Sequence, residues 1–340
     1  MSLRMHILYE IKNVPWGGGN QFLKALREEW RLQGVYEEDC EKADGILFNS
    51  HHLFKKIITL KRHYPEKIFV HRLDGIMTLT RNDSALDRII YKIAKLAADG
   101  IIFQSKWAKE KAYEMGCPRE VDHRVIFNAP DPKIFYAKSN YRPHLPVKLI
   151  ATSWSANARK GFDFLEWLDK NLDFSKYEMT FVGNSPIKFH NIKYMPPRDS
   201  QSLSGILRDH DIYIFAGKDD ACPNGLIEAL HCGLPAVFLD TGSNREIVQK
   251  AGFSFNSREE LIGAIGYVSQ NYADCQKAIN LPDIHSVTEQ YYNFFQCIQK
   301  TKNGLKTRKI SAINQLRFSF SSTKYSFCQI GKSVLTRIKV

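Results

Sequence analysis

Apolar and polar positions follow two different periods along the first part of the chain. Short apolar runs with polar or glycine boundaries predict buried strands, and longer segments with apolar residues three or four positions apart predict amphipathic helices. The predicted strands are 5–11, 44–49, 67–71, 100–104 and 123–128, and the helices between them are 20–34, 52–64, 84–98 and 106–115. Strands that alternate with helices indicate a parallel sheet covered on both faces.

The alternation begins again after a proline-containing segment, "YRPHLPVK" (141–148), which predicts a linker. The further strands are 148–154, 178–184, 211–217 and 235–240, with helices at 162–172, 202–210 and 225–233. We therefore predict an α/β fold with two Rossmann-like domains, 1–142 and 143–285, a closing helix at 286–300 and a tail at 301–340.

Composition places the chain among globular proteins, because 44% of its 340 residues are hydrophobic and 25% are charged. No apolar run approaches the roughly 18 residues that span a bilayer, and the first residues lack the zones of a signal peptide. These features favour a cytoplasmic protein. None of the seven cysteines forms a C-x-x-C pair, so we expect reduced, buried thiols rather than a zinc site or disulfides.

The positive charge is concentrated at the C-terminal end. Residues 301–340 contain nine Lys and Arg and no Asp or Glu, so that this tail supplies +9 of the net +12 and the rest of the chain only +3. This distribution argues against a nucleic-acid-binding surface over the whole chain. The tail also carries apolar residues, so two interpretations stay open: contact with an anionic membrane surface, or a disordered tail with no such role.

A glycine-rich segment, "PWGGGNQF" (15–22), joins the first predicted strand to the first helix. Gly17, Gly18 and Gly19 allow the backbone to approach a ligand closely, and the following helix N-terminus attracts an anion. Phe22 stands where a dinucleotide fingerprint has its third small residue. The segment is therefore either an anion-binding loop of another kind or a tight turn.

Two further segments combine charge with a position at the end of a strand. In "SWSANARKGFDF" (153–164), Arg159 and Lys160 precede a helix and suit a diphosphate, although they can also be a solvated pair. In "DDACPNGLIEALHCG" (219–233), Asn224 is a candidate N-cap and Glu228 lies one turn into an apolar helix. A buried carboxylate needs a partner, which can be the hydroxyls of a sugar or a nearby Lys or Arg.

The ordered set of segments resembles the family-4 retaining glycosyltransferases of GT-B fold. The run "DDACPNGLIEALHCGLPAVFLDTGSNREIV" (219–248) is similar to that family's signature, with Asp220 and Glu228 at its two Glu positions. Gly242, Ser243 and Glu246 match a later loop of the signature. Four more segments also fit, in the right order over residues 5–300: "PWGGGNQF", "FQSKWAKE", "VIFNAPDPKIF" and "RKGFDF".

The resemblance implies a role for each matching residue. Glu228 would hold the ribose of a nucleotide-sugar donor, and Asp220, shorter than the usual Glu, would contact the transferred sugar. Arg159 and Lys160 would neutralise the diphosphate without a metal or other cofactor. Backbone N–H groups near the glycine loop and near Asn224, Gly225 and Leu226 would assist, and His71 and Asp74 of "FVHRLDGI" would line the reaction site.

The implied activity is metal-independent, retaining transfer of a sugar from a nucleotide-sugar to a glycan or lipid-linked acceptor, in cell-surface polysaccharide or glycolipid synthesis. The first predicted domain has room for only about one helix before its second strand, which suggests a missing β–α unit and an open acceptor site. Two alternatives stay open. One is a nucleotide-sugar epimerase of the same fold, and the other is a non-catalytic module that binds polyanions or membranes through the tail.

Overall fold

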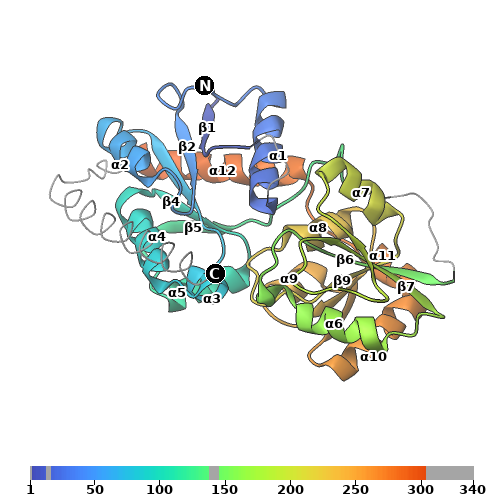
Figure 1. Cartoon of the computed structure of the whole chain (residues 1–340). Coiled ribbons are helices and arrows are strands. Elements are labelled where there is room, and N and C mark those ends of the chain that lie inside the picture. Colours follow the sequence, from blue (N-terminus) through green and yellow to red (C-terminus); the bar gives the residue numbers. More distant parts are fainter. Residues whose placement is uncertain (1, 13–16, 138–144, 304–340) are drawn as a thin grey trace.

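The computed structural model describes residues 2–12, 17–137 and 145–303 and contains two parallel sheets, each with helices packed against it (Figure 1). The predicted α/β class is confirmed. The basic tail beyond Asn303 and the centre of the predicted linker lie outside the described residues. We call the first sheet with α1–α5 the first domain, and the second sheet with α6–α11 the second domain.

The first sheet has the order β1-β2-β3-β4-β5. Its strands are β1 (Met5–Leu8), β2 (Gly45–Asn49), β3 (Ile68–Arg72), β4 (Gly100–Phe103) and β5 (Asp122–Val125), and its helices are α1 (Gly18–Leu32), α2 (Phe54–His63), α3 (Met77–Arg81), α4 (Ser84–Ala97) and α5 (Lys106–Glu114). Strands β2, β3 and β4 are buried throughout. A strand that is covered on both faces reads as a continuous apolar run, which is why these strands could be predicted.

The β–α unit that the sequence suggested to be missing is reduced to a single bridge. Tyr36 pairs with Met5 on the edge of β1 that β2 does not occupy, and the Met5 N–H donates to the Val35 carbonyl at 2.7 Å. The chain then crosses to β2 on the other side of β1. The direction of the sheet therefore reverses at β1, and such a reversal places a crevice at the carboxyl end of the strand.

The second sheet has the order β11-β10-β9-β6-β7-β8 and reverses between β6 and β9. Its strands are β6 (Val147–Ser153), β7 (Tyr177–Gly183), β8 (Lys193–Met195), β9 (Ile212–Phe215), β10 (Ala236–Leu239) and β11 (Gly252–Phe255), and its helices are α6 (Phe162–Asn171), α7 (Ser200–Arg208), α8 (Asn224–His231), α9 (Asn244–Val248), α10 (Arg258–Gln270) and α11 (Tyr272–Lys277). A single 3-10 turn, Ala158–Lys160, precedes α6.

Side-chain caps set the start of several helices. Ser105 accepts a hydrogen bond from Ala108 N at the start of α5, and Asp199 and Ser257 do the same at α7 and α10. Each cap satisfies an N–H that has no partner inside the helix. The predicted cap at Asn224 is wrong: Pro223 occupies the cap position of α8, and Asn224 is its first helical residue.

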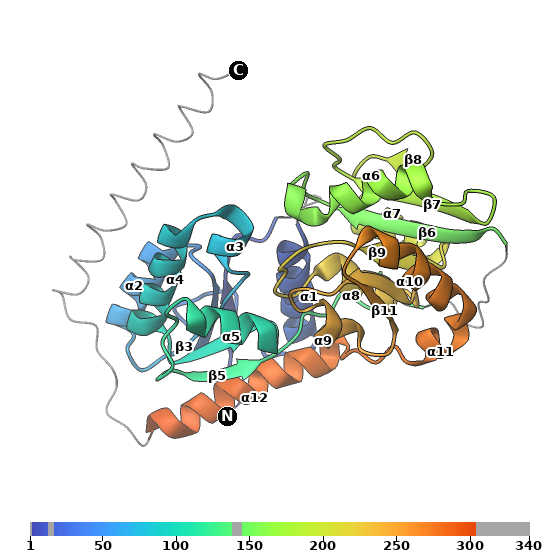
Figure 2. The ribbon, with the colours of Figure 1, turned by 90° about the horizontal axis from the view of Figure 1, so that it is seen from below.

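The last described helix, α12 (Ile284–Asn303), crosses from the second domain and lies along the first (Figure 2). Val287, Tyr291 and Phe295 are fully buried in the cluster that also holds Met5 and Trp30. The helix extends past the predicted closing segment into the predicted tail, where Lys302 Nζ donates to Asp99 at 3.0 Å and to the Lys67 carbonyl at 2.6 Å.

Candidate functional site

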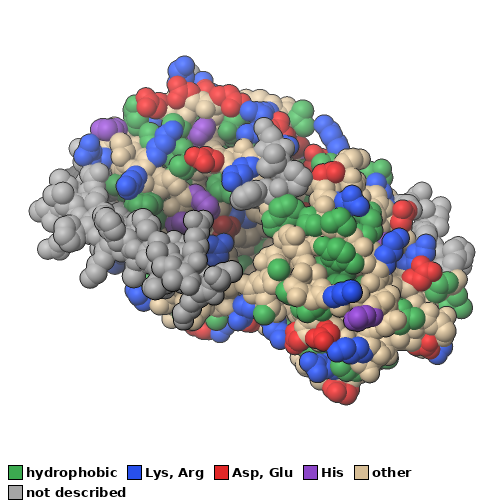
Figure 3. Space-filling model, in the orientation of Figure 1, with side chains coloured by type: hydrophobic (Ala, Val, Ile, Leu, Met, Phe, Trp, Pro, Cys, Tyr) green, Lys and Arg blue, Asp and Glu red, His purple; other side chains and the backbone are tan. Residues whose placement is uncertain are grey.

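The carboxyl ends of the two sheets face a common cleft. The surface is hollowed between the two domains, and basic and acidic side chains both lie near the hollow (Figure 3). One cavity of about 310 Å³ is bounded by Gly17 and Gly18 of the first domain and by residues of the second domain. These second-domain residues include Thr152, Ser153, Trp154, Lys160, Gly183, Arg198, Tyr213, Asp220, Gly225 and Glu228.

Glu228 is the most unusual residue of this cavity. It lies on α8, its side chain is nearly buried, and its carboxylate has no hydrogen-bond partner or counter-ion among the described residues. Burial raises the pKa of Glu228 to about 8. The alternative of a nearby Lys or Arg partner therefore does not hold, and the group is left to a partner that enters the cavity.

Two helix N-termini from different domains meet beside Glu228. Helices α1 and α8 both begin without a side-chain cap and without an acidic residue in the first turn. They approach so closely that a Cβ on Gly18 would lie 2.5 Å from the Cβ of Asn224. The free N–H groups and positive dipole ends of both helices therefore favour an anion at this point.

The predicted backbone donors differ in their availability. Gly17 and Gly18 line the 310 Å³ cavity, and Gly19 lines a neighbouring one. Gly225 lies on the floor of the first cavity, where a Cβ would be 3.0 Å from the Tyr213 hydroxyl. The Leu226 N–H, in contrast, already donates to the Pro223 carbonyl at 3.1 Å, so its predicted contribution to an anion site is wrong.

The two predicted basic residues are paired with the two aspartates that begin the signature segment. Arg159 forms an ion pair with Asp219, and Lys160 Nζ lies 3.0 Å from Asp220 Oδ2. Lys160 and Asp220 both line the 310 Å³ cavity and the neighbouring one, so this pair stands at the boundary between them. The four charges cancel in pairs, so the positive potential in the 310 Å³ cavity comes from the helix termini and from Arg198, which lines the same cavity.

The segment "TGSNRE" (241–246) packs against the loop that carries Asp220 and forms a hydrogen bond with it. Gly242 adopts φ +62, and a Cβ there would lie 2.7 Å from the Asp220 nitrogen. Ser243 N donates to the Asp220 carbonyl at 3.0 Å. Glu246 reaches the other domain, where its carboxylate accepts from Lys106 N at 2.9 Å at the start of α5. These matched residues therefore support the site from outside the 310 Å³ cavity.

The neighbouring cavity, of about 330 Å³, lies between the two domains and contains Asp74. The Asp74 carboxylate receives hydrogen bonds from Arg72 Nη1 at 2.6 Å, Asn49 Nδ2 at 2.8 Å and Gln104 Nε2 at 3.3 Å. Asp74 is therefore at the cleft, as predicted from its position after β3, and it is held rigidly by its own domain.

His71 is not at the cleft. Its side chain is fully buried, its Nε2 lies 2.7 Å from the Ser50 carbonyl, and its ring stacks on Phe48 at a centroid distance of 4.3 Å. Burial lowers the pKa of His71 to about 4, so the ring is neutral. The predicted place of His71 at the reaction site is wrong, because its ring packs on Phe48 on one face of the sheet. The side chain of Arg72 points to the opposite face, and it lines the 330 Å³ cavity together with Asp74, which lies beyond the end of β3.

Several residues of the site were not predicted from the sequence. Trp154 is an exposed aromatic side chain in the 310 Å³ cavity, and Arg198 lies at the same cavity on the loop before α7. Arg72 and Asn128 are fully buried polar residues beside Asp74. Both stand in segments that the sequence analysis quoted, "FVHRLDGI" and "VIFNAPDPKIF", but only the buried, hydrogen-bonded geometry distinguishes these two residues from their neighbours.

Within the described part of the chain, no group of three or more His, Cys, Asp and Glu side chains is arranged to hold a metal ion. No helix in the same residues is long and apolar enough to cross a bilayer.

Comparison with solved structures identifies the fold. The chain superposes on a glycosyltransferase from Rickettsia africae with a TM-score of 0.66 and 14% identity, over 88% of this chain and 99% of that one. It also matches Anabaena HepE in complex with UDP-glucose (TM-score 0.61, 14% identity, 89% and 100% of the two chains). Sucrose-phosphate synthase from Thermosynechococcus elongatus gives 0.63 at 13% identity, over 96% and 100%. The fold is GT-B.

Sequence comparison adds the domain type. Residues 156–271 match the family model "Glycosyl transferases group 1", so this part of the chain is a group 1 glycosyltransferase domain. A curated relative, the putative colanic acid biosynthesis glycosyl transferase WcaC of Escherichia coli (strain K12), is 26% identical over 128 residues. That match spans 34% of this chain and only 32% of the relative.

Proposed function

We propose that this protein is a retaining, metal-independent glycosyltransferase that moves a sugar from a nucleotide-sugar donor to a glycan or lipid-linked acceptor. The observation that carries the proposal is the buried, unpartnered carboxylate of Glu228 beside two uncapped helix N-termini. A ribose offers two neighbouring hydroxyl donors to a carboxylate, and the adjoining diphosphate offers an anion to the helix ends. A nucleotide diphosphate satisfies both features at once.

Each of the two cavities would bind a different part of the donor. In the proposed arrangement the nucleotide occupies the 310 Å³ cavity, and the transferred sugar meets the acceptor in the 330 Å³ cavity. The Lys160–Asp220 pair stands between them, so Lys160 faces the phosphate and Asp220 the sugar hydroxyls. The structure of Anabaena HepE with UDP-glucose supports a nucleotide-sugar as the donor class.

Catalysis then depends on stabilising the leaving diphosphate. As the glycosidic bond lengthens, negative charge grows on the phosphate, and Lys160 with the N-termini of α1 and α8 is positioned to offset it. For retention, the acceptor hydroxyl attacks from the side of the leaving group, and the departing phosphate accepts its proton. The match to a colanic acid glycosyl transferase supports a polysaccharide as the product.

The test is a product analysis with the full chain. Candidate UDP-, GDP-, ADP- and dTDP-sugars are first ranked by thermal shift, since a bound ligand raises the melting temperature. The best donor is then followed by NMR, with and without oligosaccharide or lipid-linked acceptors, and the anomeric configuration of the product is read. Transfer with retained configuration in the presence of EDTA is expected. Conversion of the donor alone would instead identify an epimerase, and binding of none of these donors would overturn the proposal.

A contact with an anionic membrane through residues 301–340 stays a prediction, because all but the first few of these residues lie outside the described ones. Its nine basic residues and absence of acidic ones are the reason for it. We expect the full chain to co-sediment with phosphatidylserine vesicles, and a chain without residues 304–340 to stay in the supernatant. Equal sedimentation of both chains would contradict the prediction.

A further inference from the structure

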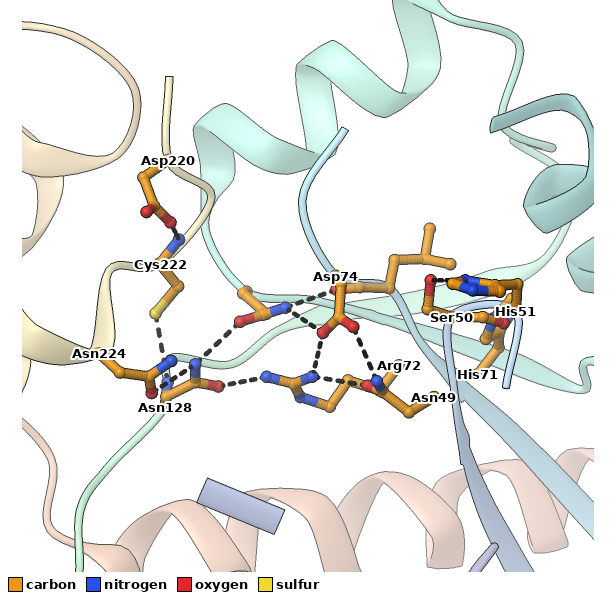
Figure 4. A network of polar contacts seen from close by, with 12 residues as sticks. Asn49, Ser50, His51, His71, Arg72, Asp74, Asn128, Asp220, Cys222 and Asn224 are labelled. Atoms are coloured by element: carbon orange, nitrogen blue, oxygen red, sulfur yellow. Dashed lines mark hydrogen bonds and ion pairs between the residues drawn. The ribbon is translucent and has the colours of Figure 1, made fainter. Parts of the chain in front are cut away.

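A buried guanidinium lies between the 330 Å³ cavity and the core of the first domain. The side chain of Arg72 is fully buried and packs over the ring of Phe22, with 4.8 Å from its Cζ to the ring centroid. Its Nη1 donates to Asn49 and Asp74, both at 2.6 Å, and its Nη2 donates to Asn128 Oδ1 at 2.8 Å (Figure 4). Burial lowers the pKa of Arg72, but the ion pair with Asp74 outweighs it and raises that pKa, so the group is permanently charged.

A guanidinium only donates hydrogen bonds, and this fixes the orientation of the next amide. Asn128 must turn its Oδ1 towards Arg72, which directs its Nδ2 to the other side. There Nδ2 donates to Gln104 Oε1 at 2.9 Å and to Asn224 Oδ1 at 3.1 Å. Asn128 is itself buried, so water does not compete for either end of its amide.

The same reasoning orients Asn224, the first residue of α8. Its Oδ1 is occupied by Asn128, and its Nδ2 has no hydrogen-bond acceptor among the described residues. This Nδ2 lies beside Gly18, where the two helix N-termini meet, since a Cβ on Gly18 would be 2.7 Å from it. Asn224 lines both the 310 Å³ and the 330 Å³ cavity, so its free amide N–H group lies where the anion is expected.

We infer that Arg72 is a positioning residue for the donor diphosphate: through Asn128 it turns the amide of Asn224 so that Nδ2, and not Oδ1, faces the phosphate. The inference rests on the proposed function for its ligand, a nucleoside diphosphate. It goes beyond that function, because Arg72 of the first domain would determine whether Asn224 of the second domain presents a donor or an acceptor to the ligand. Without Arg72 and Asn128 in this orientation, Asn224 could present an oxygen that repels the phosphate.

The test replaces Asn128 with its isostere, in the variant Asn128→Asp. The new carboxylate would keep the contact with Arg72 but could not donate, so that Asn224 would turn its Nδ2 towards it and its Oδ1 into the cavity. We expect Asn128→Asp to weaken binding of the tightest of UDP, GDP, ADP and dTDP by roughly tenfold or more, because a donor to a charged group is lost. Binding of the matching nucleoside, which lacks the phosphates, should change less than about twofold. Titration calorimetry measures both.

Two controls separate the relay from a general effect of the added negative charge. Asn171→Asp makes the same exchange at an exposed position at the end of α6 and should leave binding unchanged. In an Asn224→Ala background, Asn128→Asp should have little further effect on diphosphate binding, because the group through which it acts is absent. An undiminished effect in that background would overturn the relay.

The outcomes for the inference and for the proposed function differ. If the unaltered protein binds none of the four nucleotides and no inorganic pyrophosphate, both are overturned. If it binds them and Asn128→Asp binds equally well, only the relay is overturned. If Asn128→Asp does not fold, Asn224→Asp takes its place: it keeps the acceptor for Asn128 and replaces Nδ2 by an oxygen. The same loss is expected there, and unchanged binding by it would overturn the relay.

Discussion

The carboxyl ends of the two sheets bring Asp74 and Glu228 to the cleft, and these two carboxylates are held in opposite ways. Asp74, after β3, receives three hydrogen bonds from its own domain and pairs with the buried Arg72. Glu228, on α8 beside β9, receives none from the described residues although it is more deeply buried. A carboxylate with internal partners is fixed in place and adds to stability. One without them costs stability and is available to a ligand.

Among substitutions that test this comparison, the largest effect on stability is expected at Asp74. Asp74→Ala leaves the buried Arg72 guanidinium without its counter-ion, which should lower the free energy of unfolding by about 3 kcal/mol. Urea unfolding followed by circular dichroism measures it. Glu114→Ala, which removes an exposed carboxylate paired with Lys111, serves as the control and should leave the midpoint nearly unchanged. Equal midpoints for Asp74→Ala and the unaltered protein would contradict the comparison.

At Glu228 the expected loss is of binding rather than of stability. Glu228→Gln keeps the shape of the side chain. At a pH above the raised pKa of Glu228 it also removes the charge that strengthens hydrogen bonds from the ribose hydroxyls, so the comparison is made at that pH. Affinity for the preferred nucleotide should fall roughly thirtyfold, about 2 kcal/mol. Calorimetry measures the affinity, and Glu166→Gln, on the exposed face of α6, is the matched control. Affinity within about twofold of the original would remove Glu228 from the binding site.

The raised pKa of Glu228 predicts how stability depends on pH. In the folded state this carboxyl keeps its proton up to a pH of about 8, whereas in the unfolded chain it loses it near its ordinary pKa of 4.5. The folded state therefore binds the extra proton between these values, and stability falls as the pH rises through this window. The side chain introduced by Glu228→Gln does not titrate. The free energy of unfolding of this variant, relative to that of the unaltered protein, should therefore rise by about 1 kcal/mol for each pH unit in this window. Thermal melts in the absence of nucleotide, at intervals from about pH 5 to 8, measure the difference, and a constant difference would contradict the prediction.

The smallest effect is expected at the ion pair on the rim. Asp219→Asn releases Arg159 from a partly exposed pair, so stability should change by less than about 1 kcal/mol. The four charges at this point would no longer cancel, and inorganic pyrophosphate should bind a few times more tightly. An affinity unchanged from the original would show that Arg159 does not act on the anion.

The fold was predictable where its elements are fully buried or separate their apolar and polar residues clearly. Apolar runs such as 45–49 identified the strands, and the alternation identified two parallel sheets. Short elements such as α3 and β8 were missed, since they have five and three residues, too few to show a period. The strand at Tyr36 was missed for the same reason, because it is a single bridge. The 13-residue helix α10 was missed as well, because its exposed apolar residues Ile262 and Tyr267 blur the pattern of its buried face.

Residues of the candidate site could be predicted only where a short stretch of sequence makes them stand out. Glu228 stood out as a carboxylate in an apolar helix, and its lack of a protein partner follows from the structure. His71 was misplaced because the strand pattern gives burial but not the face on which a residue lies. Asn128 contacts Arg72 and Asn224 across separations of 56 and 96 residues in the chain, so no local pattern could reveal these contacts.

Helix α12 has a consequence for the order in which the protein is made. Val287, Tyr291 and Phe295 complete the core of the first domain, and a Cβ on Gly45 would lie 2.7 Å from the ring of Phe295. As the chain leaves the ribosome, the first domain therefore cannot close one face of its sheet until α12 has been synthesised. Until then the second domain can fold to completion, whereas the first has an uncovered apolar surface that a chaperone can bind.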